Sequence, residues 1–171
     1  ERGWEEALIN FVKAGKGTFV ATNAKVHTYN LANLIVKQLG HTLEHPISAG
    51  HFMTEIPGHR IITITSDNTG EDKVSEFVTN LNTQLLPTDI LIASPSVGTG
   101  VSIDATDGVP KFERTFGRFT RRAGNTSGDC MQHLSRVREC REFDLVILDT
   151  KEIEPVDAKM IIDDAIYKKL D

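Results

Sequence analysis

Short apolar runs alternate along the chain with longer amphipathic segments, and this alternation is the first structural signal in the sequence. The runs are rich in Ile, Val, Leu and Phe and predict buried strands at residues 18–21, 60–65, 89–93, 112–119 and 143–148. The amphipathic segments predict helices at residues 1–16, 24–39, 71–81, 131–138 and 156–170. This order predicts an α/β domain, with a mostly parallel sheet of about five to six strands and helices on both faces.

The segment at residues 131–138 predicts a helix with two different sides. Gln132 and Arg136 are four residues apart, so they share one face of a helix. The other side is apolar and can be buried, with Met131, Leu134 and Val137. Cap and first-turn residues precede it, namely Thr126, Ser127 and Asp129. We expect this helix to present an amide and a guanidinium that suit a phosphate, the alternative being an ordinary solvated basic face.

The helix at residues 24–39 also has readable limits. Thr22 and Asn23 precede it and can act as its caps, and Gly40 follows it as a stop signal. Its inner face is expected to carry Leu31, Leu34 and Ile35. By contrast, residues 41–59 show no regular pattern and are read as irregular structure.

Two polar loops follow predicted strands at the edge where open α/β sheets bind ligands. One contains Ser66 and follows strand 60–65. The other follows strand 89–93 and carries two glycines and two hydroxyl residues, namely Gly98, Thr99, Gly100 and Ser102. Such a glycine-containing loop lets the backbone approach a phosphate closely, whereas the plain alternative is a simple turn.

Composition supports one domain with a real core. The chain has 171 residues, of which 39% are hydrophobic and 25% charged, and no apolar run is long enough to span a membrane. A net charge of −5 argues against a generally basic nucleic-acid coat protein. The stretch 111–141 nevertheless carries eight basic and three acidic residues, which suits a phosphate-bearing partner.

Two tempting motifs fail on spacing. Gly15-Lys16-Gly17-Thr18 is not a phosphate-binding lysine loop, because Asn10 stands where G-x-x-x-x-G-K-[ST] needs its first glycine and Gly17 separates lysine from threonine. It is therefore expected to be a turn before a strand. Four histidines, His41, His45, His51 and His59, match no standard zinc pattern, so no metal site is expected. The two cysteines also lack metal-ligand spacing and are read as reduced thiols of a cytoplasmic protein.

Two stretches together resemble motifs of a known family. The run Ser94-Pro95-Ser96-Val97-Gly98-Thr99-Gly100-Val101-Ser102-Ile103 looks like helicase motif V, and Gln132-x-x-Ser135-Arg136-Val137-Arg138 looks like motif VI. The strand at residues 18–22 resembles motif IV. In the order of their elements and in the residues of these motifs, residues 17–150 resemble the second RecA-like domain of superfamily 2 helicases. The motifs are most similar to those of origin-binding and cyanobacterial-type plasmid replication proteins.

The resemblance implies roles for the residues of an interdomain ATP site. Arg136 would act as the catalytic arginine on the triphosphate. The usual motif has a second arginine where Glu139 stands here, so Arg138 is the candidate substitute. On an unbroken helix Arg138 would point away from Gln132, so either the helix ends near Val137 or Arg138 has another role. The resemblance assigns nucleotide contacts to Gln132, Gly100 and Ser102.

The same resemblance implies a path for nucleic acid. Contacts to its backbone fall on Ser94, Thr99, Ser66 and Thr22. The chain would then be a single C-terminal motor domain, residues 1–171, cut from a longer DNA replication protein. Its partners would be an N-terminal RecA-like domain of the same protein and single-stranded or duplex DNA, with no membrane.

Hydrolysis would need parts that this chain lacks. ATP and Mg²⁺ are expected in the full-length protein, with neither held by this domain alone, because phosphoryl transfer needs metal and lysine as well as arginine. Asp149 and the pair Asp163-Asp164 are read as surface acids. Two alternatives remain: a RecA-like module that binds nucleic acid or a partner without catalysis, and an unrelated doubly wound enzyme for a small phosphorylated ligand.

Overall fold

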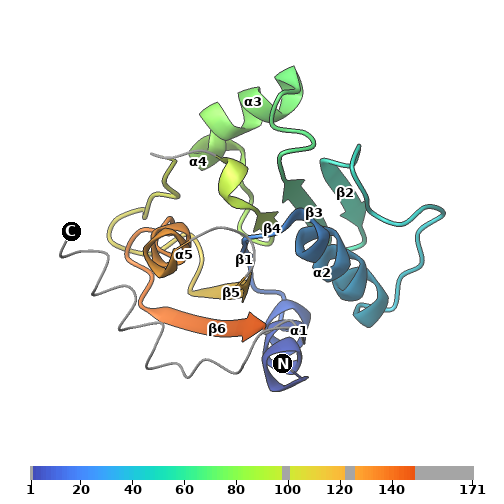
Figure 1. Ribbon diagram of the computed structural model, residues 1–171, viewed down its shortest axis with the longest axis horizontal. Coiled ribbons are helices and arrows are strands. Elements are labelled where there is room, and N and C mark those ends of the chain that lie inside the picture. Colours follow the sequence, from blue (N-terminus) through green and yellow to red (C-terminus); the bar gives the residue numbers. More distant parts are fainter. Residues whose placement is uncertain (1, 98–100, 122–125, 149–171) are drawn as a thin grey trace.

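The computed structural model describes residues 2–97, 101–121 and 126–148, which form a six-stranded sheet in the order β2-β3-β4-β1-β5-β6 (Figure 1). The strands are β1 (Thr18–Thr22), β2 (Met53–Ile56), β3 (His59–Ile64), β4 (Ile90–Ala93), β5 (Arg114–Thr120) and β6 (Glu142–Leu148). Five of them are parallel, and β2 is an antiparallel edge strand paired with β3. The predicted α/β class and mostly parallel sheet are confirmed.

Helices cover both faces of the sheet, as predicted (Figure 1). One face carries α1 (Arg2–Lys13) and α2 (Lys25–Gln38), and the other carries α3 (Asp72–Thr79), α4 (Leu81–Gln84) and α5 (Ser127–Leu134). A single 3₁₀ turn, η1 (Pro95–Val97), follows β4. No helix in the described ranges is long and apolar enough to cross a membrane.

The central strands explain the continuous apolar runs in the sequence. All residues of β1 and β4 are buried, because each strand has neighbours on both edges and helices on both faces. Along β1 the side chains alternate between the two cores: Phe19 and Ala21 pack with α5, whereas Val20 packs with α2. The sheet is therefore rigid where its carboxyl ends carry the candidate site.

The turn before β1 confirms the structural reading of Gly15-Lys16-Gly17-Thr18. Gly15 has φ +76°, a conformation that glycine adopts readily. Gly17 lies so close to the segment before β4 that an added Cβ would sit 2.1 Å from the carbonyl oxygen of Pro87. The positive φ of Gly15 and the close packing of Gly17 thus explain why both positions are glycine, without a bound phosphate.

The predicted cap of α2 is wrong. The N-cap residue is Ala24, with no side-chain cap hydrogen bond. Asn23 instead binds the last residue of β5: its Nδ2 donates to the Thr120 carbonyl (2.6 Å) and its Oδ1 accepts from the Thr120 amide (2.8 Å). The Asn23 side chain thus joins the ends of β1 and β5. These two hydrogen bonds to Thr120 replace the helix-capping bond that the local sequence favours. The predicted stop at Gly40 is confirmed, with φ +82°.

The strand β2 lies in the stretch that the sequence reading left irregular. It has four residues, of which two are half-buried, one is exposed and one is buried, and it turns into β3 at Gly58, which has φ +84°. A short edge strand with one partner carries little apolar alternation, so the pattern alone did not reveal it.

The helix α5 is shorter than predicted. It ends at Leu134, and Ser135 is its C-cap, so Arg136 lies beyond the helix and does not share a helical face with Gln132. Leu134 and Val137 are buried as predicted. Met131 was also expected on the buried apolar side, but this prediction is wrong, because its side chain is 49% exposed. The predicted start is confirmed, since Thr126 and Asp129 form a capping box.

The remaining helices match the pattern in part. Residues 71–81 contain α3 and the start of α4, and Val74, Phe77 and Leu81 are buried. The predicted helix at 156–170, and the acids Asp149, Asp163 and Asp164, lie outside the described residues.

Candidate functional site

The candidate site lies at the carboxyl edge of the parallel strands. Because β3, β4, β1 and β5 run in the same direction, the loops after them meet at one edge of the sheet (Figure 1). The end of α5 and the segment after it come to the same place, because His133 of α5 bonds to Ala93 at the end of β4 and Arg136 bonds to Val101 of the following loop. Residues from both motif-like stretches are thus brought together.

A chain of hydrogen bonds links the two stretches. The ring Nε2 of His133 lies 2.7 Å from the carbonyl oxygen of Ala93. The other ring nitrogen, Nδ1, accepts from Nε of Arg136 at 2.8 Å. Arg136 also donates through Nη1 to the carbonyl oxygen of Val101 at 3.0 Å. The guanidinium is therefore bound to the end of the glycine-containing loop, and through His133 to its beginning.

Backbone pairing reinforces this link. Ile103 and Val137 form a parallel bridge: the Ile103 amide donates to the Arg136 carbonyl (2.7 Å) and the Arg138 amide donates to the Ile103 carbonyl (2.9 Å). Both bridging side chains are buried. The segment after α5 therefore acts as a short strand fragment that fixes the exit of the loop.

The end of α5 decides between the two alternatives for Arg138: the helix stops at Leu134, before Val137. Val137 is buried in its bridge with Ile103, whereas Arg136 is half-buried and Arg138 is exposed. The helical argument that separated them does not apply, because the helix ends first.

Arg136 is a half-buried cation at this edge of the sheet. Burial lowers the pKa of its guanidinium, and among the described residues no carboxylate forms an ion pair with it. A half-buried cation without an acidic partner attracts an anion, and a guanidinium can bind a phosphate at two points. This is the strongest chemical feature of the edge.

A second cation at the same edge behaves differently. Lys25 pairs with Asp67 (2.7 Å), and Asp67 also accepts from the hydroxyl of Tyr29 (2.9 Å). Hydrogen bonds from Lys25 and then Tyr29 lower the pKa of Asp67. The Tyr29 hydroxyl is also 2.7 Å from that of Thr65. The sequence reading missed this cluster, whose positive charge is internally neutralised.

The predicted nucleotide residues are only partly assembled. Gln132 is exposed on α5, and within the described residues it shares no hydrogen-bond partner with Arg136. Ser102 uses its hydroxyl to donate to Asp104 (2.8 Å), and Asn82 of α4 binds both the Ser102 carbonyl and Asp104. Gly100 lies outside the described residues.

The predicted nucleic-acid residues fall into different environments. Ser66 is exposed in the loop after β3. Ser94 is buried, with its hydroxyl 2.6 Å from that of Ser96. Thr22 is fully buried, and its hydroxyl lies 2.8 Å from that of Thr28. Thr99 lies outside the described residues. Of the three that are described, only Ser66 presents its side chain to solvent.

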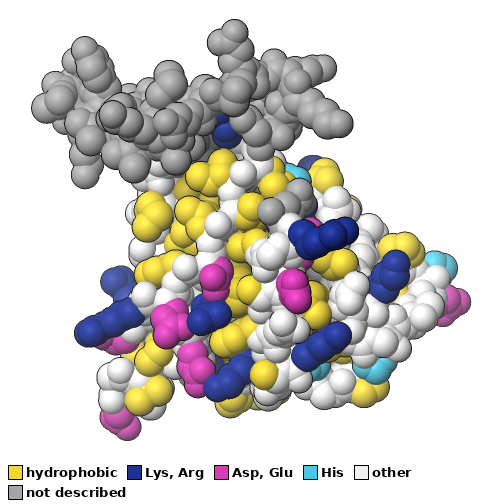
Figure 2. All heavy atoms as spheres, turned by 90° about the horizontal axis from the view of Figure 1, so that it is seen from below, with side chains coloured by type: hydrophobic (Ala, Val, Ile, Leu, Met, Phe, Trp, Pro, Cys, Tyr) yellow, Lys and Arg dark blue, Asp and Glu magenta, His cyan; other side chains and the backbone are white. Residues whose placement is uncertain are grey.

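The local basic stretch is less positive than its sequence count implies. Arg114 pairs with Glu142 (2.9 Å) and Asp144 (3.3 Å), and Arg118 pairs with Glu5 of α1 (3.6 Å). On the face shown in Figure 2, acidic and basic side chains are interspersed. Attraction of an anion therefore depends on particular arginines and not on a broad basic surface.

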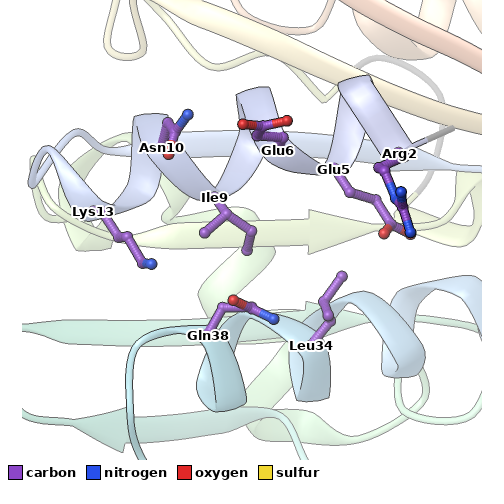
Figure 3. A pocket seen from close by; sticks show the side chains of 8 residues that line it. All are labelled: Arg2, Glu5, Glu6, Ile9, Asn10, Lys13, Leu34 and Gln38. Carbon is purple, nitrogen blue, oxygen red and sulfur yellow. The ribbon is translucent and has the colours of Figure 1, made fainter.

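A groove between α1 and α2 lies on the other face of the sheet from α5 (Figure 3). Its lining mixes both charge signs with amide and apolar side chains, with Arg2, Glu5, Glu6, Ile9, Asn10, Lys13, Leu34 and Gln38. This mixture selects no anion. Within the described ranges, no group of three or more His, Cys, Asp or Glu could hold a metal ion.

His133 is the residue that sequence reasoning missed. It was one unmarked position inside the motif-like segment, and only folding brings its ring to Ala93, 40 residues earlier. Comparison with known proteins adds no assignment: no family model matches the chain, and no curated protein matches it significantly. The function must therefore be argued from the geometry.

Proposed function

We propose that this chain is the second motor domain of an ATP-dependent DNA helicase or translocase from a replication protein. The observation that carries the proposal is the half-buried guanidinium of Arg136, which has no carboxylate partner among the described residues and is bonded to the loop after β4. Such a group suits the negative charge of a transferring phosphoryl group. The motif V and motif VI resemblance supplies the specific reaction.

In this proposal ATP and Mg²⁺ are bound by a first motor domain. That domain supplies the phosphate-binding lysine and the metal ligands, because this sequence contains no G-x-x-x-x-G-K-[ST] loop. Arg136 would complete the site when the two domains close, and Arg138, exposed two residues later, would be a second donor. Gln132, exposed one turn earlier, is available for the nucleotide or for the facing domain.

The nucleic acid would bind along the same edge. Ser66 is exposed after β3, and the loop between Ala93 and Ile103 is fixed at both ends by bonds to the segment that carries Arg136. Any displacement of this loop by a bound strand is transmitted to the guanidinium through Val101. Closure on ATP and movement along DNA can thus be coupled mechanically.

The test is ATP hydrolysis by the protein that contains both motor domains, measured with and without single-stranded DNA. For Arg136→Ala we expect kcat to fall by roughly a thousandfold or more, the usual loss for an arginine finger. The matched control is Arg114→Ala, which removes an arginine already paired with Glu142 and Asp144 and should leave kcat near the wild-type value. Wild-type turnover in a folded Arg136→Ala protein contradicts the proposal.

A second candidate is a RecA-like module that binds nucleic acid without hydrolysis. One observation favours it: Glu139, with φ +62°, stands where the usual motif has its second arginine. A folded two-domain protein that binds DNA but hydrolyses no ATP would establish this module instead.

A further inference from the structure

Both ring nitrogens of His133 are used inside the protein. The side chain is only 2% exposed, and its ring packs edge-on against Phe19, with 5.8 Å between centroids and an interplanar angle of 88°. Nε2 faces the Ala93 carbonyl oxygen, which can only accept a proton, so Nε2 must donate. Nδ1 faces Nε of Arg136, which can only donate, so Nδ1 must accept.

Only the neutral imidazole with its proton on Nε2 meets both demands. A protonated ring would point a second N–H at the guanidinium. Burial, opposed by the bond to Ala93 and helped by the charge of Arg136, lowers the pKa of His133 to about 4. The ring therefore stays neutral around pH 7, and Nδ1 remains a permanent acceptor for Arg136.

We propose that His133 is a positioning residue that fixes the guanidinium of Arg136 at the carboxyl edge of the sheet and joins it to both ends of the loop after β4. The positioning is a property of this chain, whereas its effect on catalysis rests on the proposed function. Two bonds, from Nε to His133 and from Nη1 to Val101, set the position and plane of the guanidinium. A guanidinium has five N–H donors, so three remain for an anion.

Positioning matters because arginine is a long and flexible side chain. A free arginine loses rotamer entropy when it is ordered on a ligand. Because His133 already orders the Arg136 side chain, less entropy is lost when an anion binds. Phosphoryl transfer depends largely on such positioning and on electrostatic stabilisation. His133 also receives the end of β4, so a shift at Ala93 moves the acceptor of Arg136 directly.

The first experiment uses the 171-residue chain and needs no catalytic assay. Nitrogen NMR of the His133 ring should show the Nε2–H form at pH 7. Hydrogen exchange of the Arg136 Nε–H should be at least tenfold faster in His133→Phe than in wild type. Phenylalanine keeps an aromatic ring against Phe19 but removes the acceptor. Unchanged exchange in this variant overturns the inference.

The matched control is His133→Gln, whose amide can donate to Ala93 and accept from Arg136. We expect it to retain most of the protection of the Arg136 Nε–H. If His133→Phe does not fold, His133→Asn carries the test, because its amide lies one bond closer to the backbone than that of glutamine and loses at least one partner. Full protection in the asparagine variant would overturn the inference.

The second experiment measures DNA-stimulated ATP hydrolysis in the two-domain protein. His133→Phe should lower kcat by 10- to 100-fold with little change in KM for ATP, and His133→Gln should restore most of the loss. In an Arg136→Lys background, which has no Nε–H donor, His133→Phe should add no further loss. An equal loss in both backgrounds means a merely structural role and overturns the positioning inference.

The two proposals fail in different ways. Normal turnover in Arg136→Ala overturns the motor function, while the exchange experiment still decides whether His133 holds Arg136. Rapid turnover that depends on Arg136 but not on His133 overturns the catalytic effect of positioning and leaves the motor function standing.

Discussion

At the scale of single residues, the environment of an arginine decides what it can do. Arg60 is bonded twice to the buried carboxylate of Asp89, and Arg114 is paired with Glu142 and Asp144. Among the described residues, the partners of the Arg136 guanidinium are neutral, namely His133 and the Val101 carbonyl. Of these three arginines, Arg136 is therefore the one whose charge no described carboxylate balances, which makes it the candidate to bind an anion.

The buried His133 predicts a specific dependence of stability on pH. Its pKa falls from 6.5 to about 4 on folding. Between these two pH values the imidazole therefore binds a proton in the unfolded chain but not in the native protein. The stabilising contribution is complete above pH 6.5 and is lost progressively as the pH falls to about 4. The total loss is up to about 3 kcal/mol.

The measurement is the free energy of unfolding from urea titrations between pH 7 and pH 4, for wild type and His133→Gln. All other titrating groups are common to both proteins, so the difference isolates His133. We expect the glutamine variant to show the shallower fall with decreasing pH. Parallel curves for the two proteins would contradict the neutral, buried imidazole.

At the scale of elements, an ion pair joins the amino ends of two neighbouring strands. Asp89 precedes β4 and is fully buried; it accepts from Arg60 of β3 at 2.9 and 2.6 Å and from the Leu86 amide at 2.7 Å. The pair therefore fixes both the register of the strands and the turn before β4.

We expect Asp89→Ala to lower the free energy of unfolding by about 3 kcal/mol, because the change leaves Arg60 and the Leu86 amide without their acceptor. Chemical denaturation gives the value. The matched control is Glu113→Ala, which breaks the exposed pair with Lys16 and should cost less than about 1 kcal/mol. Equal losses in the two variants would show that burial does not set the strength of these pairs.

The element scale also shows where sequence patterns were sufficient. The buried strands β1, β3, β4 and β5 and the helices α1 and α2 follow from apolar runs and periodicity. The end of α5 did not follow, because residues 135–138 fit a helical pattern but form a bridge with Ile103 instead. That partner is more than 30 residues away, and no local preference contains it.

At the scale of the whole molecule, one edge of the sheet carries the half-buried Arg136, and the sequence contains no G-x-x-x-x-G-K-[ST] loop that could hold a phosphate. The two glycines of residues 15–18 serve a tight turn and a close approach to Pro87. Within the described ranges, no carboxylate pairs with Arg136 and no cluster of potential ligands could hold a metal near it. On the proposed function, the chain would supply the arginine part of the machinery for phosphoryl transfer, and the first motor domain would supply the rest.

We therefore expect the 171-residue chain alone to hydrolyse no ATP above background, with or without DNA. Phosphate release from the purified chain measures this, and the two-domain protein under the same buffer is the positive control. Steady DNA-stimulated hydrolysis by the chain alone, abolished by Arg136→Ala, would show a complete active site and contradict the half-site model.

The sequence by itself determined the class of fold, most strands and helices, and the loops that end at the ligand-binding edge, because these depend on apolar periodicity and on glycine at local turns. It also singled out Arg136 as the central residue of the candidate site. Only the tertiary structure decided which groups surround that arginine. His133, Val101 and Ile103 come from distant positions, and the end of α5 depends on pairing with Ile103. Contacts between distant segments arise when the two helical layers pack on the sheet, so short-range patterns do not encode them.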